Sequence, residues 1–329
     1  MLDRGKLIRE KSIREVRKQT GPIYRNAMKK VRKQIGDYTA RFAEADAEKR
    51  KQLEREEITK DEYRSWKMAT VFSGGWRAQS KKAAQTMTEA NQKALDVVNN
   101  QQVKAFAESA NRQMYEASRK TGISAGFGVY NQQAVDILTN QQPSLLPGSG
   151  NPNPLKPRKR IKPGKDNRYN QQIIANTVAQ SIMEGDSIPD LADALADALG
   201  NSNGDSMMLW AQTAMTSAQN AGTMEAMHQA EDMGIKCRKR WLATLDSRTR
   251  ESHGEVDGET VDLDEEFSNG LQYPGDPSGD PSEVYNCRCT MTYVYEDYPD
   301  EPHGRRDVEN DQVISDVTYK EWLRMNGGI

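Results

Sequence analysis

The sequence predicts an α+β protein that is mostly α-helical and has a small antiparallel sheet near its C-terminus. Three observations lead to this fold class. Apolar residues recur at helical intervals through most of the first 138 residues. A stretch rich in proline and glycine then interrupts the helical pattern at 142–167. After Gly234 the hydrophobic pattern changes to a period of two, which is typical of strands.

The same pattern divides the 329 residues into five regions. We expect a long helical N-terminal region with a basic arm (1–141), a Pro/Gly-rich basic linker (142–167), a helical middle (168–234), a small α+β module (235–295) and an acidic tail with a short terminal helix (296–329). The linker is expected to be extended, because proline removes backbone donors and fixes φ.

Local signals predict where the helices begin and end. Ser73, Gly74 and Gly75 interrupt the N-terminal helices, and a long helix follows at 76–118. That helix carries one apolar stripe, which we expect to dock on a partner; its members are Ala84, Met87, Leu95, Val98, Phe106 and Met114. A further short helix is expected at 131–140.

Glycine marks the helix ends in the middle region. Ser187 is expected to cap a helix that Gly200 closes. A second helix, 205–233, is expected to end at Gly234.

The C-terminal module reads as strands joined by turns. Residues 235–245 and 288–295 suit strands, and Asp246 is expected to cap a short helix that carries His253. Asp257-Gly258 predicts a tight turn. In the tail, residues 319–323 suit a short docking helix.

Charge and cysteine content limit the classes of function. The formal net charge is only −2, yet the first residues are strongly basic. This arm would bind DNA of any sequence by neutralising phosphates, or it would be a solvated helix face opposite an acidic chain; it contains Arg4, Lys6, Arg9, Lys11, Arg14, Arg17 and Lys18. Three cysteines without a secretion signal favour a reducing compartment over a disulfide framework. No apolar run is long enough to span a membrane.

Scarce metal-binding side chains gather in the last third of the chain. Cys237, His253, Cys287 and Cys289 supply the four N and S donors that a tetrahedral zinc ion prefers. The C-x-C spacing differs from the usual finger spacing of two to four residues between cysteines. The alternative is a pair of buried structural thiols, with His253 hydrogen-bonded to Asp246 or Asp257.

The same segment permits a catalytic interpretation. A phosphate-handling or general-base site, as in a nuclease, would use Arg248, Arg250, His253, Asp257 and Glu283. We favour a structural Arg–carboxylate network, because no Gly-rich phosphate loop, nucleophile elbow or His/Asp metal pair accompanies these residues. We therefore assign no catalytic residue and no small-molecule substrate.

Motif order over some fifty residues adds a resemblance. The chain reads W-x-A-T-x-D-x-R-T-R-x-x-H, then D-G, then E-x-x-N-C-R-C. The matching residues are Trp241, Asp246, Arg248, Thr249, Arg250, His253, Asp257, Gly258, Glu283, Asn286, Cys287, Arg288 and Cys289. This pattern resembles the Mu-F-like minor capsid, or head morphogenesis, family of tailed phages. The resemblance covers roughly 115–295, and the family's A-R-T-E sequence is replaced here by Ala211-Gln212-Thr213-Ala214.

The resemblance implies a minor capsid protein inside the phage head. Such proteins act in procapsid assembly in the host cytoplasm, associate with the portal and with the major capsid or scaffold proteins, and stay with the packaged genome. From the residues alone, a metal-dependent hydrolase or nuclease with His253 at its site, or a DNA-binding accessory protein, remain the alternatives.

Overall fold

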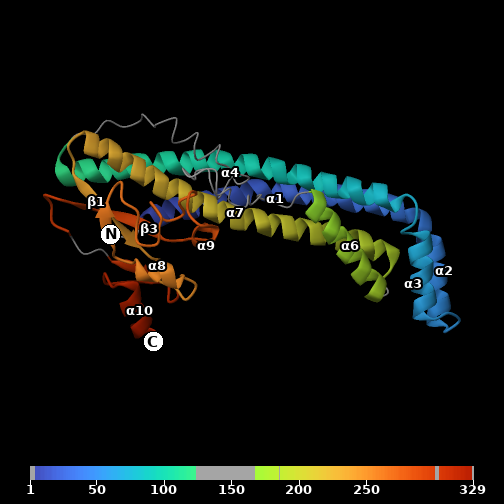
Figure 1. Ribbon diagram of the computed structural model, residues 1–329. Helices are drawn as coiled ribbons and strands as arrows, with labels where there is room; N and C mark the ends of the chain where they lie inside the picture. Colours follow the sequence, from blue (N-terminus) through green and yellow to red (C-terminus); the bar gives the residue numbers. More distant parts are fainter. Residues whose placement is uncertain (1–3, 124–166, 185, 301–303, 328–329) are drawn as a thin grey trace, which may run out of the picture. The chain divides into compact units, whose positions relative to one another are not determined.

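The computed structural model describes residues 4–123, 167–184, 186–300 and 304–327. Its helices are α1 (Arg4–Thr39), η1 (Ala40–Phe42), α2 (Ala43–Glu54), α3 (Lys60–Thr70), α4 (Trp76–Thr121), α6 (Asn167–Glu184), α7 (Ile188–Asp232), α8 (Glu251–Glu255), α9 (Pro281–Val284) and α10 (Tyr319–Met325). Its strands are β1 (Cys237–Leu242), β2 (Thr260–Asp262), β3 (Thr290–Tyr295), β4 (Arg305–Asp307) and β5 (Gln312–Ile314) (Figure 1). The mostly helical α+β fold class is confirmed.

The chain forms two compact units. The site unit draws on Met1–Val16, Val98–Lys162 and Met208–Ile329, and the helical unit draws on Arg17–Val97 and Pro163–Met207. These boundaries differ from the expected ones after residues 141 and 234, because α1, α4 and α7 each contribute residues to both units. The predicted helix at 131–140 and the linker up to residue 166 lie outside the described residues.

Buried amides link four helices of the helical unit. The Tyr24 hydroxyl of α1 donates to Asn91 Oδ1 of α4 at 2.9 Å. The Asn91 amide donates to Asn203 Oδ1 of α7 at 2.6 Å, and the Asn203 amide donates to Asn170 Oδ1 of α6 at 2.8 Å. Because the side-chain amides of Asn91, Asn203 and Asn170 all have partners, this network fixes the register of the helices instead of costing stability.

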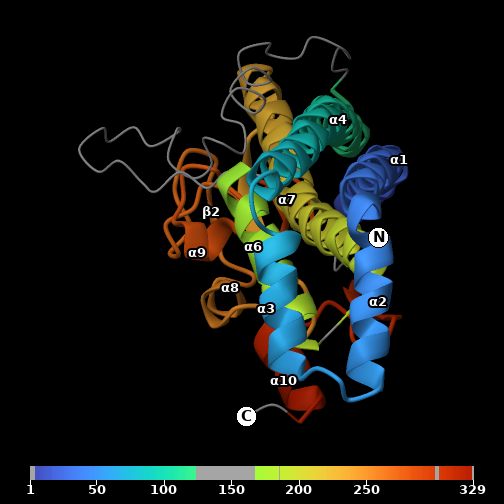
Figure 2. The ribbon, with the colours of Figure 1, turned by 90° about the vertical axis from the view of Figure 1, so that its right-hand side faces the viewer.

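Helices α2 and α3 lie side by side (Figure 2). Thr59 begins α3 with a capping box, since its hydroxyl accepts from the Glu62 backbone N–H while the Glu62 carboxylate accepts from the Thr59 N–H. The Tyr63 hydroxyl then donates to Asp46 of α2 at 2.6 Å, which joins the two helices.

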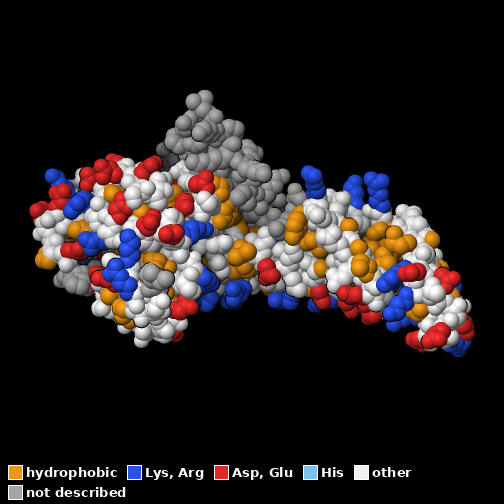
Figure 3. Space-filling model, turned by 60° about the horizontal axis from the view of Figure 1, so that its bottom comes forward, with side chains coloured by type: hydrophobic (Ala, Val, Ile, Leu, Met, Phe, Trp, Pro, Cys, Tyr) orange, Lys and Arg blue, Asp and Glu red, His pale blue; other side chains and the backbone are white. Residues whose placement is uncertain are grey.

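The apolar stripe of α4 packs inside the chain. Ala84, Met87, Val98, Phe106 and Met114 are buried and Leu95 is half-buried, so this stripe is not the exposed docking face that was expected. Neighbouring helices cover the stripe, and the sequence of this one helix could not show which helices would pack against it. On the face drawn in Figure 3, hydrophobic side chains form separate areas among charged side chains of both signs.

Helix α7 runs through Gly200 without a break, which corrects the expected helix end there. A Cβ at Gly200 would lie 2.3 Å from the Met28 sulfur, so this glycine allows α1 to approach closely. The expected end at Gly234 is confirmed, where φ is +89°.

The sheet of the site unit has the order β2-β1-β3 and is antiparallel. Trp241 of β1 is fully buried and packs edge-on against Phe267 at 5.1 Å between ring centroids. The same core includes Ala110, Met114 and Ala117 of α4. The C-terminal module therefore shares its core with a helix from the first half of the chain.

Two local features differ from expectation in this unit. The helix that carries His253 begins after Arg250, and Asp246 instead accepts from the Arg248 backbone N–H at 3.0 Å in the preceding turn. The acidic tail adds the ribbon β4–β5, which was not expected, besides the expected helix α10. None of the described helices has the length and apolar character that a bilayer-spanning segment needs.

Candidate metal centre

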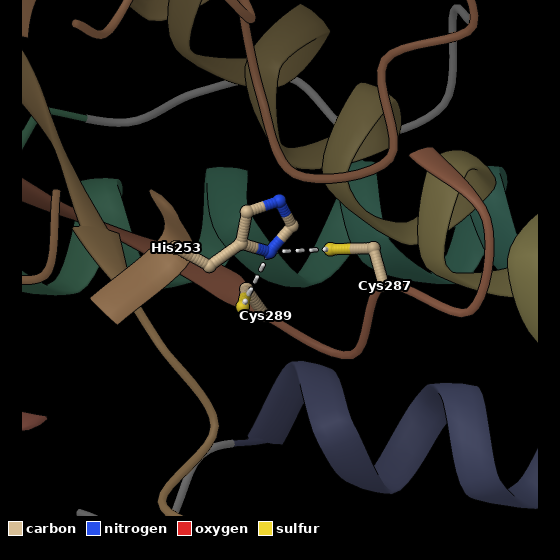
Figure 4. A group of neighbouring side chains, drawn as sticks. All are labelled: His253, Cys287 and Cys289. Atoms are coloured by element: carbon tan, nitrogen blue, oxygen red, sulfur yellow. Dashed lines mark hydrogen bonds between the residues drawn. The ribbon is translucent and has the colours of Figure 1, made fainter. Parts of the chain in front are cut away.

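Three soft donor side chains converge in the site unit (Figure 4). His253 comes from α8, while Cys287 and Cys289 lie in the loop between α9 and β3. The His253 Nδ1 atom lies 3.8 Å from Cys287 Sγ and 3.5 Å from Cys289 Sγ. All three side chains are almost completely buried, at 1%, 1% and 2% exposure. One imidazole nitrogen and two sulfurs form a donor set that suits zinc.

Cys237 does not join this group. It pairs with Tyr295 at one end of the β1–β3 ladder, whereas Cys289 precedes Thr290 at the other end. Five residues of strand separate the two ends by roughly 16 Å. Burial, together with the nearby Glu231 and Glu296, raises the pKa of the Cys237 thiol to about 12. The expected set of four donors is corrected to three, because sequence spacing does not fix where along a strand a side chain lies.

The other face of His253 meets Glu283. The His253 Nε2 atom lies 3.0 Å from Glu283 Oε2, and the Ser252 hydroxyl donates to the same oxygen at 2.8 Å. The alternative partners of the sequence analysis are engaged elsewhere, since Asp246 binds Arg288 and Asp257 binds Arg305. The carboxylate thus holds one ring nitrogen while the other faces the two sulfurs.

Side chains from three segments hold the backbone of the C-x-C loop. The Thr216 hydroxyl donates to the Cys287 carbonyl at 2.9 Å, and the Asn220 amide donates to the Cys289 carbonyl at 3.2 Å. Between them, the Arg288 carbonyl accepts from Arg9 at 2.6 Å and from Thr244 at 2.7 Å. These contacts fix both sulfur positions before any ligand binds.

The preceding residue shapes the same loop. Asn286 has a φ of +56°, a left-handed conformation that asparagine tolerates better than most residues. Its backbone N–H donates to the Thr213 hydroxyl at 3.0 Å. Together with a guanidinium contact from Arg250 to the Tyr285 carbonyl, this turns the chain so that both cysteines face inward.

The two cysteine thiols have unequal proton affinities. Burial by itself raises the pKa of Cys287, but hydrogen bonds with Cys289 and nearby positive charges together hold that pKa below its usual value. The charges of Arg250 and Arg9 add to this lowering. Burial and the neighbouring Cys287 raise the pKa of Cys289 well above its usual value.

The structure brings only some residues of the catalytic interpretation together, since His253 lies 3.0 Å from Glu283 while other members have different contacts. Asp257 forms a buried ion pair with Arg305 at 2.7 Å, and Arg248 is exposed. A cavity of about 710 Å³ in this unit is lined by Asp257 and Arg305, but not by His253 or the two cysteines. This cavity therefore gives no access to the buried donor group.

Comparison with known proteins identifies this region. Residues 172–292 match the family model described as Phage Mu protein F like protein. The Mu-F-like resemblance is confirmed. The matched Mu-F-like region contains most of α6, all of α7 and the whole group of His253, Cys287 and Cys289.

Three proteins share parts of this sequence. The chain is 27% identical over 221 residues to the minor head protein GP7 of Bacillus phage SPP1, covering 66% of this chain and 68% of GP7. It is 33% identical over 153 residues to NAD(+)–arginine ADP-ribosyltransferase EFV of Enterococcus faecalis, covering 46% of this chain and 31% of EFV. It is 32% identical over 142 residues to an uncharacterized protein of Haemophilus influenzae, covering 43% of this chain and 28% of that protein.

The extent of these matches differs. The chain spans about two thirds of GP7 but less than a third of the Enterococcus and Haemophilus proteins. No solved structure matches the chain significantly.

The Mu-F-like region contains supporting residues that the sequence analysis missed. Thr213, Thr216 and Asn220 lie on one face of α7 and contact the C-x-C loop. These three polar residues are spaced by three and four positions in a helix rich in alanine and methionine, and this spacing could have shown that they share one helix face. Polar residues on an otherwise buried helix face indicate that something polar packs against them.

The residues of the basic arm differ in their contacts. Arg9 is buried and holds the C-x-C loop, and Lys11 forms an ion pair with Glu108 at 3.0 Å. Arg14, Arg17 and Lys18 are exposed, and Lys6 lies 4.0 Å from Glu10. The side chain of Arg4 lies outside the described residues.

Proposed function

We propose that this chain is a minor head protein that acts in head assembly of a tailed phage and stays inside the virion. One observation carries this proposal, namely the 27% identity to the SPP1 minor head protein GP7 along two thirds of both chains. The family match at 172–292 supports it independently, because it covers the same module that holds the donor group. The expected partners are the portal protein and the major capsid or scaffold proteins.

A structural role fits the geometry of the module better than catalysis does. The donor group is buried, and the neighbouring side chains donate hydrogen bonds to backbone carbonyls of the C-x-C loop. A catalytic centre would instead keep a position open for substrate. The similarity to EFV covers 31% of that protein, so the transferase activity in its name supports no enzymatic assignment here. The nuclease alternative has no observation in its favour.

Contact with packaged DNA forms part of the same proposal. The exposed side chains of Arg14, Arg17 and Lys18 follow one another on α1, where they can neutralise phosphates without reading base sequence. Arg9 is excluded from this role because it is buried against the C-x-C loop.

Co-assembly with cognate head proteins tests the proposal. The full chain is co-expressed with the portal, major capsid and scaffold proteins of the same phage, and procapsids are purified by sedimentation. We expect the chain to co-sediment with procapsids that contain portal and to be absent from, or strongly reduced in, shells assembled without portal. If the chain stays at the top of the gradient in both preparations, a head-assembly role is contradicted. Equal amounts in both shells would contradict portal association alone.

A further inference from the structure

We propose that His253 Nδ1, Cys287 Sγ and Cys289 Sγ bind one zinc ion that stabilises the Mu-F-like module. The inference does not depend on the assembly role, because it rests on the geometry of these side chains. The described residues supply three donors, which leaves one position of a tetrahedral ion to a further donor.

The two nitrogen–sulfur separations match those around a tetrahedral zinc ion. Bonds of about 2.0–2.1 Å to nitrogen and about 2.3 Å to sulfur place neighbouring ligand atoms roughly 3.5–3.8 Å apart. The two observed nitrogen–sulfur separations are 3.5 and 3.8 Å, and all three donor atoms lie within 4.8 Å of one another. An ion at their centre therefore requires little movement of the side chains.

Glu283 orients the histidine for this role. Its carboxylate lies 3.0 Å from Nε2, while Nδ1 faces the two sulfurs; a ring proton on Nε2 would leave the Nδ1 lone pair for the metal. Metal-binding histidines commonly have such a carboxylate on their second nitrogen. A weak thiol–imidazole contact alone would not require this arrangement.

Charge and preorganisation favour the same occupant. Two thiolates and one divalent cation sum to zero, so the complete centre carries no net charge into a buried site. The loop that presents the sulfurs is held through its carbonyls by Arg9, Thr216, Asn220 and Thr244. The donors are thus fixed by groups that are not themselves ligands.

The enclosure of the group indicates a structural ion. His253 and both cysteines are at most 2% exposed, and the Trp241 ring packs edge-on against the His253 ring at 5.2 Å between centroids. Catalytic zinc keeps a position that substrate can reach, whereas structural zinc is closed off and contributes to folding stability.

Metal analysis of the full chain tests the proposal. Protein made in zinc-supplemented medium and purified without a histidine tag should contain about one zinc per chain by mass spectrometry. Cys289→Ser should lose nearly all of it, while Cys237→Ser should retain it. Cys237 is the matched control because it is also a buried free cysteine of the same unit, yet lies outside the donor group.

Absorption spectroscopy of the wild-type chain tests the site without relying on variants that could misfold. Cobalt replaces zinc after chelation and gives a thiolate charge-transfer absorption only when sulfur binds the metal. Saturation at one cobalt per chain, retained in Cys237→Ser, supports the site. A wild-type chain with no stoichiometric metal and no such absorption would overturn it. A different stoichiometric metal would overturn the zinc assignment, and equal metal loss in both variants would overturn the ligand set.

Discussion

At the residue scale, Glu283 is expected to orient the His253 ring without binding the metal itself. It touches His253 Nε2 rather than the face that meets the sulfurs. We expect Glu283→Ala to keep the zinc but weaken its affinity about 10–100-fold, because the imidazole loses the contact that fixes its orientation. Competition with a chelator that reports zinc release measures this change. The control is Glu251→Ala, an exposed glutamate of the helix that carries His253, which should release zinc like the wild type.

The buried Lys239 should make the free energy of unfolding depend on pH. It is fully buried, and its ammonium donates to the Leu263 carbonyl at 2.7 Å and to Gln272 at 2.9 Å. Burial lowers its pKa to about 8, from 10.5 in an unfolded chain. Between these values the unfolded chain binds more protons, so stability rises with pH across this window.

The measurement is the free energy of unfolding between pH 7 and pH 9. We expect it to increase by roughly 1 kcal/mol in the wild type, since the folded lysine loses its proton within this range. Lys239→Met should remove the increase. A wild-type profile that is flat or falls over this range would contradict the lowered pKa.

At the element scale, three glycines of α7 make different contacts. A Cβ at Gly222 would lie 2.3 Å from the Phe106 carbonyl oxygen of α4, which is backbone and cannot move aside. At Gly200 the nearest atoms belong to the flexible Met28 side chain. At Gly204 the nearest atom is 3.9 Å away. Only the first of these glycines is required by an adjacent backbone.

Alanine substitutions should therefore differ within one helix. Gly222→Ala should destabilise the site unit by about 1–3 kcal/mol through overpacking. Gly204→Ala should be neutral or stabilising by up to about 1 kcal/mol, because alanine favours the helix. Thermal unfolding followed by circular dichroism compares them, and equal loss in both variants would refute the packing argument.

A buried ion pair contributes to the attachment of the ribbon β4–β5 to the module. Arg305 donates to both Asp257 oxygens, at 2.7 and 3.0 Å, and to the Ala243 and Val317 carbonyls. Arg305→Ala should cost about 3–5 kcal/mol, because Asp257 would be left buried without its partner. Arg306→Ala is the matched control, since its pair with the exposed Asp311 lies at the surface and should matter little. Chemical denaturation followed by tryptophan fluorescence measures both, and similar midpoints would contradict the difference.

At the scale of the whole molecule, the Mu-F-like module depends on the first half of the chain. Its core includes Ala110, Met114 and Ala117, and its C-x-C loop is held by Arg9. A fragment of residues 168–329 would lack these core residues and the Arg9 contact. This fragment should fail to unfold cooperatively, and residues 1–123 supplied in trans should restore a cooperative transition. A sharp thermal transition for the isolated fragment would show that the shared core is dispensable.

Residue periodicity and motif order determined much of this protein. Helical spacing predicted the helical fold class, and Gly234 predicted a helix end. The ordered motif from Trp241 to Cys289 predicted the resemblance to the Mu-F-like family and three side chains that the structure brings together as possible metal donors. These features follow from interactions between residues near in sequence, or from residue types that are scarce elsewhere in the chain.

Only the tertiary structure decided which distant residues meet. In the structure, Cys237 lies a strand's length away from the donor group. Gly200 is not a helix end but a site of close contact with Met28, and the α4 stripe is largely buried within the chain. The structure also revealed that Arg9, expected to face DNA, holds the loop between the cysteines. The reason is physical: local sequence specifies which face of an element is apolar or polar, but the packing of whole elements specifies what that face contacts.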